Sequence, residues 1–306
     1  MIRIENLVKT YGAVHALDGL SLEVEAGVVY GFLGPNGAGK TTSMRILSGL
    51  ARADSGRAWI LDKEIGQPGS DVRSLIGVLP EEPAFYGWMT PRDYLRDFVA
   101  PLYKIHGQVA ARRADEMLEI VGLKEDANRR IGGFSRGMRQ RMGLAQALLH
   151  RPPVLLLDEP VSALDPAGRK EVLDLIETLR GQTTILLSTH ILADVERVCD
   201  VIGIIARGRL IAQDRREDLL ARYVTPLFEI EADTGFGDWL EWVKQQAFVT
   251  NVTVLNHTAR VLVKDIPRAQ KALLESLAGG ALSVRRFEMV HPSLEDVFLR
   301  LTEKEA

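Results

Sequence analysis

The sequence predicts an α/β fold followed by a second, smaller α+β domain. Residues 154–158 (VLLLD) and 183–189 (TTILLST) are short, continuous runs of apolar and β-branched residues. Such runs are typical of parallel strands buried on both faces, and helical segments between them give the alternation of an α/β fold. The hydrophobic pattern then changes near residues 223–226, which indicates a domain boundary.

Composition limits the classes of protein to which this chain can belong. Of 306 residues, 46% are hydrophobic and 26% are charged, as in ordinary globular proteins. A formal net charge of −3 offers no basic surface, so no nucleic-acid partner is expected. Cys199 is the only cysteine, and no signal peptide or apolar run of about 18 residues is present. We therefore expect a cytoplasmic protein, for which any membrane-embedded part is another chain.

Two strands are predicted near the amino terminus, at residues 21–27 and 28–34, and the second runs into a glycine-rich turn. The turn, GPNGAGKT, fits the phosphate-binding pattern G-x-x-x-x-G-K-[ST]. Its glycines allow backbone N–H groups to point inward around a phosphate, and the helix that follows adds its positive end. The residues expected to bind a nucleotide here are Gly34, Pro35, Asn36, Gly37, Ala38, Gly39, Lys40, Thr41 and Thr42.

Two side chains of this turn have separate expected roles. Lys40 can reach the β- and γ-phosphates of ATP, and the Thr41 hydroxyl can ligate Mg²⁺. An ordinary glycine-rich connection is the alternative interpretation, but a strand before the turn, a helix after it and Lys-Thr at its end favour nucleotide binding. ATP and Mg²⁺ are therefore the expected cofactors.

A helical insert is expected between about residues 83 and 150. Thr90 is the expected N-cap of its first helix, with Pro91 at the first helical position. The apolar stripe of this helix is expected at Leu95, Phe98, Val99 and Leu102. A second helix should end at Gly122, with its stripe at Ala110, Ala114, Met117, Leu118 and Val121. Ser135 can cap a third helix.

Residues 224–306 are predicted to form the second domain. Strands are expected at residues 227–232, 252–256, 260–263 and 282–289, with helices at 239–247 and 269–277. This βαββαβ order is that of the ferredoxin-like fold, and a last helix is expected at residues 293–301.

Two acidic residues lie at the end of the predicted strand of residues 154–158 and directly after it. Asp158, at its end, can hold Mg²⁺ through water, and Glu159 can orient and deprotonate the attacking water as a general base. The alternative interpretation is a solvated acidic turn, and the phosphate-binding loop in the same chain argues against it.

Together these motifs resemble the ATP-binding cassette of ABC transporters. FSRGMRQR, residues 134–141, resembles the ABC signature, usually written LSGGQ: Ser135 and Gly137 match, whereas Arg136 and Met138 depart from it. SALD, ending at Asp165, matches the D-loop, and STH, ending at His190, matches the switch histidine. Tyr11 stands where the family stacks an aromatic ring on adenine. The tail from His291 resembles ATPases that serve drug, antibiotic and polysaccharide exporters.

The resemblance covers about residues 1–220 and implies an ATPase subunit that powers transport through a separate integral membrane permease. It places residues 1–223 in the nucleotide-binding domain. It also implies an ATP-dependent head-to-tail homodimer, in which Ser135 and Gly137 meet the nucleotide held by the other subunit. Asp165 is expected to bind the nucleotide as well. His190 would hydrogen-bond the γ-phosphate. The chain would lie on the inner face of the cell membrane, bound through its permease, and export is the expected direction.

One residue departs from the family pattern near the expected metal. The family has a glutamine after the strand that opens the helical insert, where it touches Mg²⁺, and this chain has Glu81. A carboxylate is still a hard oxygen ligand, but it adds negative charge beside the phosphates. Directly after it come four large apolar residues, which either dock a permease helix or pack under the insert: Phe85, Tyr86, Trp88 and Met89.

Two other functions are weighed against transport. A soluble ABC ATPase acting on ribosomes or nucleic acid would need a second cassette, a long coiled coil or a basic face, none of which the sequence shows. An ATP-binding regulator without turnover is disfavoured because Lys40, Asp158, Glu159 and His190 are all present.

Overall fold

The computed structural model describes residues 1–68, 70–162, 164–223, 227–233, 235–279, 282–290 and 294–303. The chain divides into two compact units, Met1–Arg216 and Glu217–Lys304. Four parts of the sequence-based interpretation lie outside the described residues: Ala163 of the SALD motif, residues 224–226 at the predicted boundary, residues 291–293 and residues 304–306.

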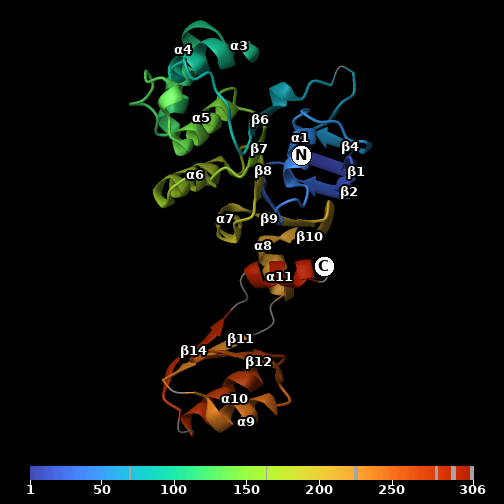
Figure 1. Cartoon of the computed structure of the whole chain (residues 1–306), viewed down its shortest axis with the longest axis vertical. Helices are drawn as coiled ribbons and strands as arrows, with labels where there is room; N and C mark the ends of the chain where they lie inside the picture. The colour runs from blue at the N-terminus through green and yellow to red at the C-terminus, as the bar shows by residue number, and fades with distance from the viewer. Residues whose placement is uncertain are drawn as a thin grey trace. The chain divides into compact units, whose positions relative to one another are not determined.

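A six-stranded sheet forms the centre of the first unit, as Figure 1 shows. Five of its strands run parallel, and the last is an antiparallel edge strand. In spatial order the strands are β6 (Ile76–Leu79), β7 (Val154–Asp158), β8 (Thr184–Thr189), β3 (Val29–Leu33), β9 (Val201–Ala206) and the edge strand β10 (Arg209–Arg215). Every residue of β3, β7 and β8 is buried, so the predicted strands of a doubly covered parallel sheet are confirmed.

A second, antiparallel sheet is built from two strands before and two strands after the phosphate-binding loop. Its strands, in spatial order, are β2 (Val14–Val24), β1 (Ile2–Tyr11), β4 (Ser55–Ile60) and β5 (Lys63–Glu64). Helix α1 (Lys40–Leu47) contributes Met44, Ile46 and Leu47 to the apolar core shared with both sheets. The two sheets also join at an edge, where the Asp18 N–H donates to the Gly208 carbonyl at 3.0 Å.

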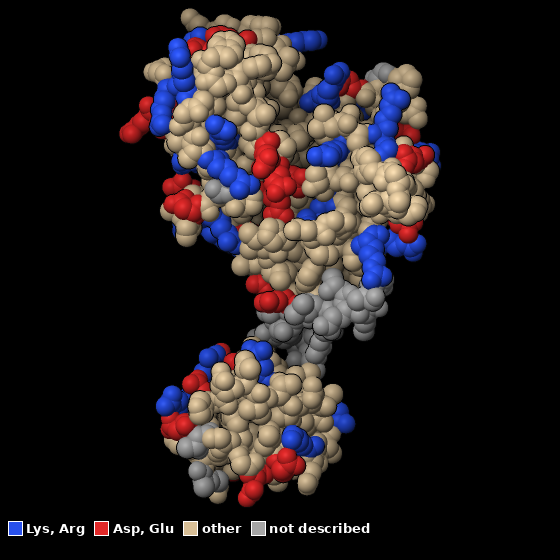
Figure 2. Space-filling model, in the orientation of Figure 1, with Lys and Arg blue, Asp and Glu red and all other residues tan. Residues whose placement is uncertain are grey.

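The other helices of the sheet lie opposite α1. In Figure 1, α1 and the antiparallel sheet lie on one side of the parallel sheet, and α5 (Arg136–Leu148), α6 (Pro166–Leu179) and α7 (Leu192–Val198) lie on the other. On the face drawn in Figure 2, basic and acidic side chains are interspersed, and several acidic residues gather near the middle of the first unit.

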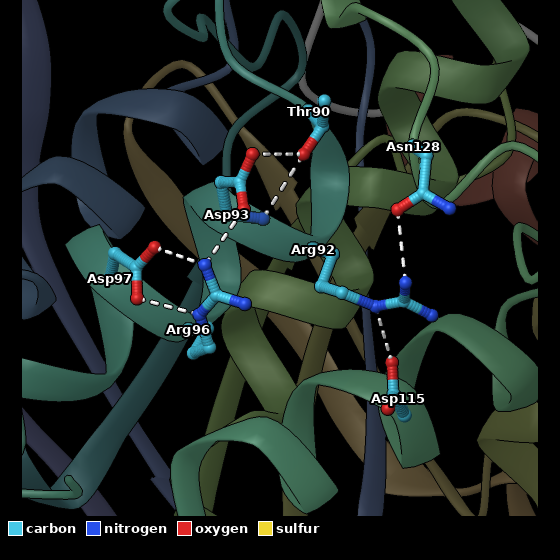
Figure 3. Close-up of polar contacts among 7 residues, drawn as sticks. All are labelled: Thr90, Arg92, Asp93, Arg96, Asp97, Asp115 and Asn128. Atoms are coloured by element: carbon cyan, nitrogen blue, oxygen red, sulfur yellow. Dashed lines mark hydrogen bonds and ion pairs between the residues drawn. The ribbon is translucent and has the colours of Figure 1, made fainter. Parts of the chain in front are cut away.

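The insert begins as the sequence predicts. The Thr90 hydroxyl accepts a hydrogen bond from the Asp93 N–H at 3.2 Å and caps α2 (Pro91–Asp93). Figure 3 shows Arg92 reaching from this turn to Asp115, at 2.8 Å, and to Asn128, at 2.9 Å. Because Asp115 lies on α4 (Gly107–Ile120), Arg92 joins the start of the insert to its second helix.

The predicted apolar stripe of the first insert helix is wrong at two positions. Leu95 and Val99 are buried, but Phe98 is exposed and the Leu102 side chain is 69% exposed. The cause is a π-helical turn, η2 (Tyr94–Val99), which continues into α3 (Ala100–Leu102). A π-helix has more residues per turn than an α-helix, so the buried face passes through Tyr94, Leu95, Val99 and Ala100.

The other two insert helices match their predictions. Ala110, Ala114, Met117, Leu118 and Val121 are all buried, and α4 is followed by Gly122 with φ 66°. Ser135 caps α5, its hydroxyl accepting from the Met138 N–H at 3.2 Å. Helix α5 packs closely on β6, because a Cβ atom added at Gly143 would lie 2.5 Å from Leu79 Cδ1.

The second unit has the predicted βαββαβ order. Its antiparallel sheet runs, in space, β12 (Val249–Leu255), β13 (Thr258–Val263), β11 (Leu227–Ala232) and β14 (Val284–Val290). Helices α9 (Gly237–Lys244) and α10 (Ile266–Ala278) contribute Trp239, Val243 and Leu273 to the core of this sheet. The unit also contains α11 (Leu294–Glu303), and α8 (Arg216–Tyr223) leads into it.

Candidate functional site

The candidate site lies where four parallel strands end. Strands β3, β8, β7 and β6 have their carboxyl ends at one edge of the sheet, and the residues after them are drawn together there. This edge is where open α/β sheets bind ligands. A pocket of about 320 Å³ opens at it, lined by Val14, Ala16, Asn36, Gly37, Ala38, Gly39, Lys40, Thr41, Thr42, Glu81, Asp158, Glu159 and His190.

The glycine-rich loop owes its shape to two close approaches. A Cβ atom at Gly34 would lie 2.4 Å from the Ile205 carbonyl oxygen, so no other residue fits without displacing β9. Gly39 has φ 110° and directly precedes α1, and a Cβ atom there would lie 2.6 Å from the Ala16 carbonyl oxygen. The loop can therefore follow this path only with glycine at both positions.

Lys40 is held within the loop. Its Nζ donates to the carbonyl oxygens of Gly34, at 2.6 Å, and of Pro35, at 3.2 Å. Burial lowers the pKa of the Lys40 ammonium, and the nearby carboxylates of Glu159, Asp158 and Glu81 oppose that shift. The site thus places one buried cation among three acidic side chains.

Asp158 and Glu159 are fixed by the neighbouring strand. Asp158 is the last residue of β7, and its carboxylate accepts a hydrogen bond from the Ser188 hydroxyl on β8. The Glu159 carboxylate accepts from Thr189 Oγ1 at 3.3 Å and lies 2.8 Å from His190 Nδ1. Glu159 is buried, whereas half of the His190 side chain is exposed. Two carboxylates and an imidazole therefore converge on the pocket that contains Lys40.

The structure does not bring every predicted site residue to this pocket. Tyr11, Ser135, Gly137 and Asp165 are described but do not line it. Tyr11 is 47% exposed at the end of β1, with Lys9 Nζ 5.2 Å from its ring centre. Asp165 caps α6 by accepting from the Gly168 N–H at 3.1 Å. Gly34 and Pro35 contact Lys40 but are not lining residues either.

Two lining residues were missed by the sequence analysis. Val14 and Ala16 belong to β2, and both line the pocket together with the glycine-rich loop. No motif marks them, because their contribution is apolar surface beside a loop that lies about 20 residues further along the chain.

The oxygen-bearing side chains suit Mg²⁺, although they do not form a complete cage. Thr41, Glu81 and Asp158 all line the same pocket and offer hard oxygen ligands. Within the described residues, no group of three or more His, Cys, Asp or Glu side chains could hold a metal ion by itself. This partial ligand set fits Mg²⁺, which usually takes one or two protein carboxylates together with substrate phosphates and water.

The aromatic residues after Glu81 differ in how far they are buried. The Phe85 ring packs edge-on against Tyr94, at 5.4 Å between centroids, as expected of residues under the insert. Tyr86 packs on Phe98, at 5.1 Å, but is half exposed, and Trp88 is 71% exposed. A second pocket, of about 610 Å³, lies beside them between Glu82, Phe85 and Arg136.

No helix among the described residues is long and apolar enough to cross a membrane.

Two family models match the chain, one in each part. The model described as ABC transporter matches residues 17–162, which contain the glycine-rich loop, the signature and Asp158. The model described as ATP-binding protein DrrA1-3-like, C-terminal domain, matches residues 215–302.

Relatives and solved structures agree with these models. The ABC transporter ATP-binding protein YxlF of Bacillus subtilis (strain 168) is 41% identical over 301 residues, which cover 98% of this chain and 99% of YxlF. The bacitracin transport ATP-binding protein BcrA of Bacillus licheniformis is 42% identical over 303 residues, with 98% of this chain and 97% of BcrA covered. The dimeric structure of MJ0796, a bacterial ABC transporter cassette, is 25% identical, covers 70% of this chain and 98% of its own, and gives a TM-score of 0.65. The resemblance inferred from the motifs is therefore confirmed, and this chain belongs to the family of ABC transporter ATP-binding proteins.

Proposed function

We propose that this chain is the ATPase subunit of an exporter, which it drives through a separate integral membrane permease. The observation that supports this most is the single pocket in which Lys40, Asp158, Glu159 and His190 converge. Export of an antibiotic-like compound is supported by the similarity to BcrA over 98% of this chain and by the DrrA1-3-like second unit. The alternatives, an ATPase acting on ribosomes or nucleic acid and a regulator without turnover, have no comparable support.

In this proposal the glycine-rich loop and Lys40 bind the phosphates of ATP. The loop N–H groups and the start of α1 provide partial positive charge, and Lys40 provides a full charge. Thr41, Asp158 and Glu81 would hold Mg²⁺, which when bound neutralises charge on the β- and γ-phosphates. Tyr11, with an exposed ring at the end of β1, would stack on the adenine.

Hydrolysis would depend on Glu159 as the general base. The carboxylate takes a proton from the attacking water while Lys40 stabilises the charge that develops on the phosphate. His190 orients the carboxylate through its Nδ1 contact of 2.8 Å, and its half-exposed ring remains accessible to the γ-phosphate.

A complete site would require two copies of the chain. Ser135, Gly137 and Asp165 do not line the pocket of their own subunit. A head-to-tail dimer would present the signature and D-loop of each chain to the nucleotide of the other, giving two equivalent sites. The dimeric MJ0796 cassette, at 25% identity, supports this arrangement.

The permease would dock on the loop that carries Phe85, Tyr86 and Trp88. Trp88 and Tyr86 present exposed rings beside the pocket lined by Glu82, Phe85 and Arg136. An exposed aromatic group with a charged rim is typical of a protein interface. Through this contact the chain would be held at the cytoplasmic face of the membrane.

The proposed function can be tested by complementation. A strain that lacks this chain but retains its permease should become sensitive to the exported antibiotic, and the wild-type chain should restore resistance. Glu159→Gln should not restore it. Trp88→Ala, which leaves the nucleotide pocket unchanged, should keep the ATPase activity of the purified chain yet also fail to restore resistance. Resistance restored by Glu159→Gln as well as by the wild type would contradict an ATP-driven exporter.

A further inference from the structure

The main-chain carbonyl of Glu159 accepts three hydrogen bonds. Two come from Ser162, from its N–H at 3.3 Å and its hydroxyl at 3.1 Å. The third comes from the side-chain amide of Gln140, with Nε2 at 3.4 Å from the carbonyl oxygen. Ser162 lies in the turn that follows Glu159, whereas Gln140 reaches this carbonyl from 19 residues earlier in the chain.

The peptide that accepts these bonds has an unusual conformation. Glu159 has φ 48°, in the left-handed region that a residue with a side chain rarely adopts. Such a conformation persists only where the surrounding structure determines it. The Glu159 N–H donates to the Ser188 carbonyl at 3.0 Å on one side, and the carbonyl receives Gln140 and Ser162 on the other. Because the backbone sets where the side chain leaves it, these bonds also set the direction of the Glu159 carboxylate.

Gln140 brings the helical insert into this arrangement. It lies on α5, the helix capped by Ser135, and is only 1% exposed although its side chain is polar. On the same helix Gly143 packs against β6, since a Cβ atom added there would lie 2.5 Å from Leu79 Cδ1. Among the described hydrogen bonds to Glu159, the bond from Gln140 is the one that originates in the insert.

We propose that Gln140 is a positioning residue for hydrolysis, which links the signature end of α5 to the general base of the same chain. A shift of α5 changes the support of the Glu159 carbonyl, and with it the direction of the carboxylate toward the water. The inference rests on the proposed role of Glu159. It adds a route by which contacts made at Ser135 reach Glu159 without passing through the nucleotide.

The first test replaces Gln140 with methionine, which has a similar length and volume but no donor. Gln140→Met should lower kcat about tenfold, the scale of one hydrogen bond made to a buried group, and change the KM for ATP by less than about twofold. Gln146→Met is the matched control. Gln146 lies on the same helix and accepts from the Tyr94 hydroxyl at 2.8 Å inside the insert. The Gln146→Met variant should retain the kcat of the wild type.

A second test separates positioning from a general loss of structure. In a Glu159→Gln background, Gln140→Met should lower the residual single-turnover rate by less than about twofold, because the carboxylate on which it acts is gone. An equal tenfold loss in both backgrounds, or wild-type kcat in Gln140→Met, overturns the proposal. If Glu159→Gln itself turns over normally, the proposed general base fails instead.

Gln140→Asn serves as the second variant, since it retains an amide that is too short to reach Glu159 and cannot overfill the site. It should show the same loss of kcat. If neither variant folds, as judged by circular dichroism and ATP binding, Gln140 is required for folding and the proposal is overturned.

Discussion

Nδ1 of His190 lies 2.8 Å from Oε1 of Glu159, across the ends of two adjacent parallel strands. The two residues are separated by 31 positions in the sequence, and the pairing of β7 with β8 brings them together. The contact joins the proposed general base to the residue that would orient it.

The Glu159→Gln variant should bind ATP with Mg²⁺ but hydrolyse it at least ~100-fold more slowly, the scale of general-base catalysis. The amide retains the size of the carboxylate but cannot accept the proton. An ATP-bound dimer should then accumulate and be detected by size-exclusion chromatography. Near-normal turnover in the purified variant would remove Glu159 from the mechanism.

The Glu81→Gln variant should bind ATP with Mg²⁺ as tightly as the wild type, or more tightly. Glu81 lines the same pocket as Asp158 and Glu159, so the substitution removes one of three negative charges near the phosphates. Equilibrium binding of a fluorescent ATP analogue, with and without Mg²⁺, measures the effect. Collapse of the Mg²⁺-dependent binding would instead make the carboxylate an essential ligand.

A chain shortened to residues 1–223 should still bind ATP. All residues of the nucleotide pocket lie within the first compact unit, Met1–Arg216. Binding is measured by isothermal titration, and circular dichroism serves as the control for folding. A folded fragment that does not bind ATP would show that the second unit completes the site.

Each active site should be shared between two chains. Lys40 lines the pocket and Ser135 does not, so a monomer holds only part of the predicted site. The specific activity of the isolated protein should therefore rise with its concentration. Full activity from a chain that remains monomeric with ATP, measured by sedimentation, would exclude the shared site.

A mixture of two inactive variants provides a second test of the site shared between two chains. Lys40→Ala and Ser135→Arg should each be inactive, whereas a mixture should recover part of the activity. A mixed dimer places both substitutions in one site and leaves the other with intact Lys40 and intact Ser135. The homogeneous variants, assayed at the same total concentration, are the controls.

His150 should make stability depend on pH. Burial lowers the pKa of this imidazole to about 4, with a smaller contribution from Arg113, while the bond from Nε2 to the Ile76 carbonyl at 3.0 Å opposes the shift. The unfolded chain, with a histidine pKa of about 6.5, binds the proton more readily than the folded chain. This contribution to stability is therefore present above about pH 6.5 and is lost as the pH falls toward 4.

The variant His150→Phe isolates this effect. Phenylalanine can still stack on Tyr103, whose ring centre lies 3.6 Å from that of His150, but it cannot be protonated. The urea midpoint of the wild type should fall more between about pH 7 and about pH 5 than that of the variant, since most carboxylates stay ionised there. Equal pH dependence of the two proteins would contradict a buried neutral His150.

Much of the site could be predicted from the sequence because its chemistry is local. The turn from Gly34 to Thr41 is a continuous segment in which glycines, a lysine and a threonine have fixed places. Asp158 ends a recognisable buried strand and Glu159 directly follows it. The fold of the second unit was predictable because strands and helices in a βαββαβ order can be connected in only a few topologies.

Other features depended on contacts between distant segments. The antiparallel sheet of β1, β2, β4 and β5 places Val14 and Ala16 at the pocket, and neither residue belongs to a motif. The burial of Phe98 was mispredicted because a π-helical turn changes which residues face the core. No local sequence pattern predicts that turn.

The sequence by itself thus determined the type of fold, the phosphate-binding loop and the acidic residues of the site, because short-range spacing encodes backbone geometry and side-chain chemistry. Only the tertiary structure decided which distant groups meet. It paired His190 with Glu159 and buried Gln140 against the Glu159 carbonyl. Strand order and helix packing fix such distances, and they arise from long-range burial of apolar surface that no local pattern records.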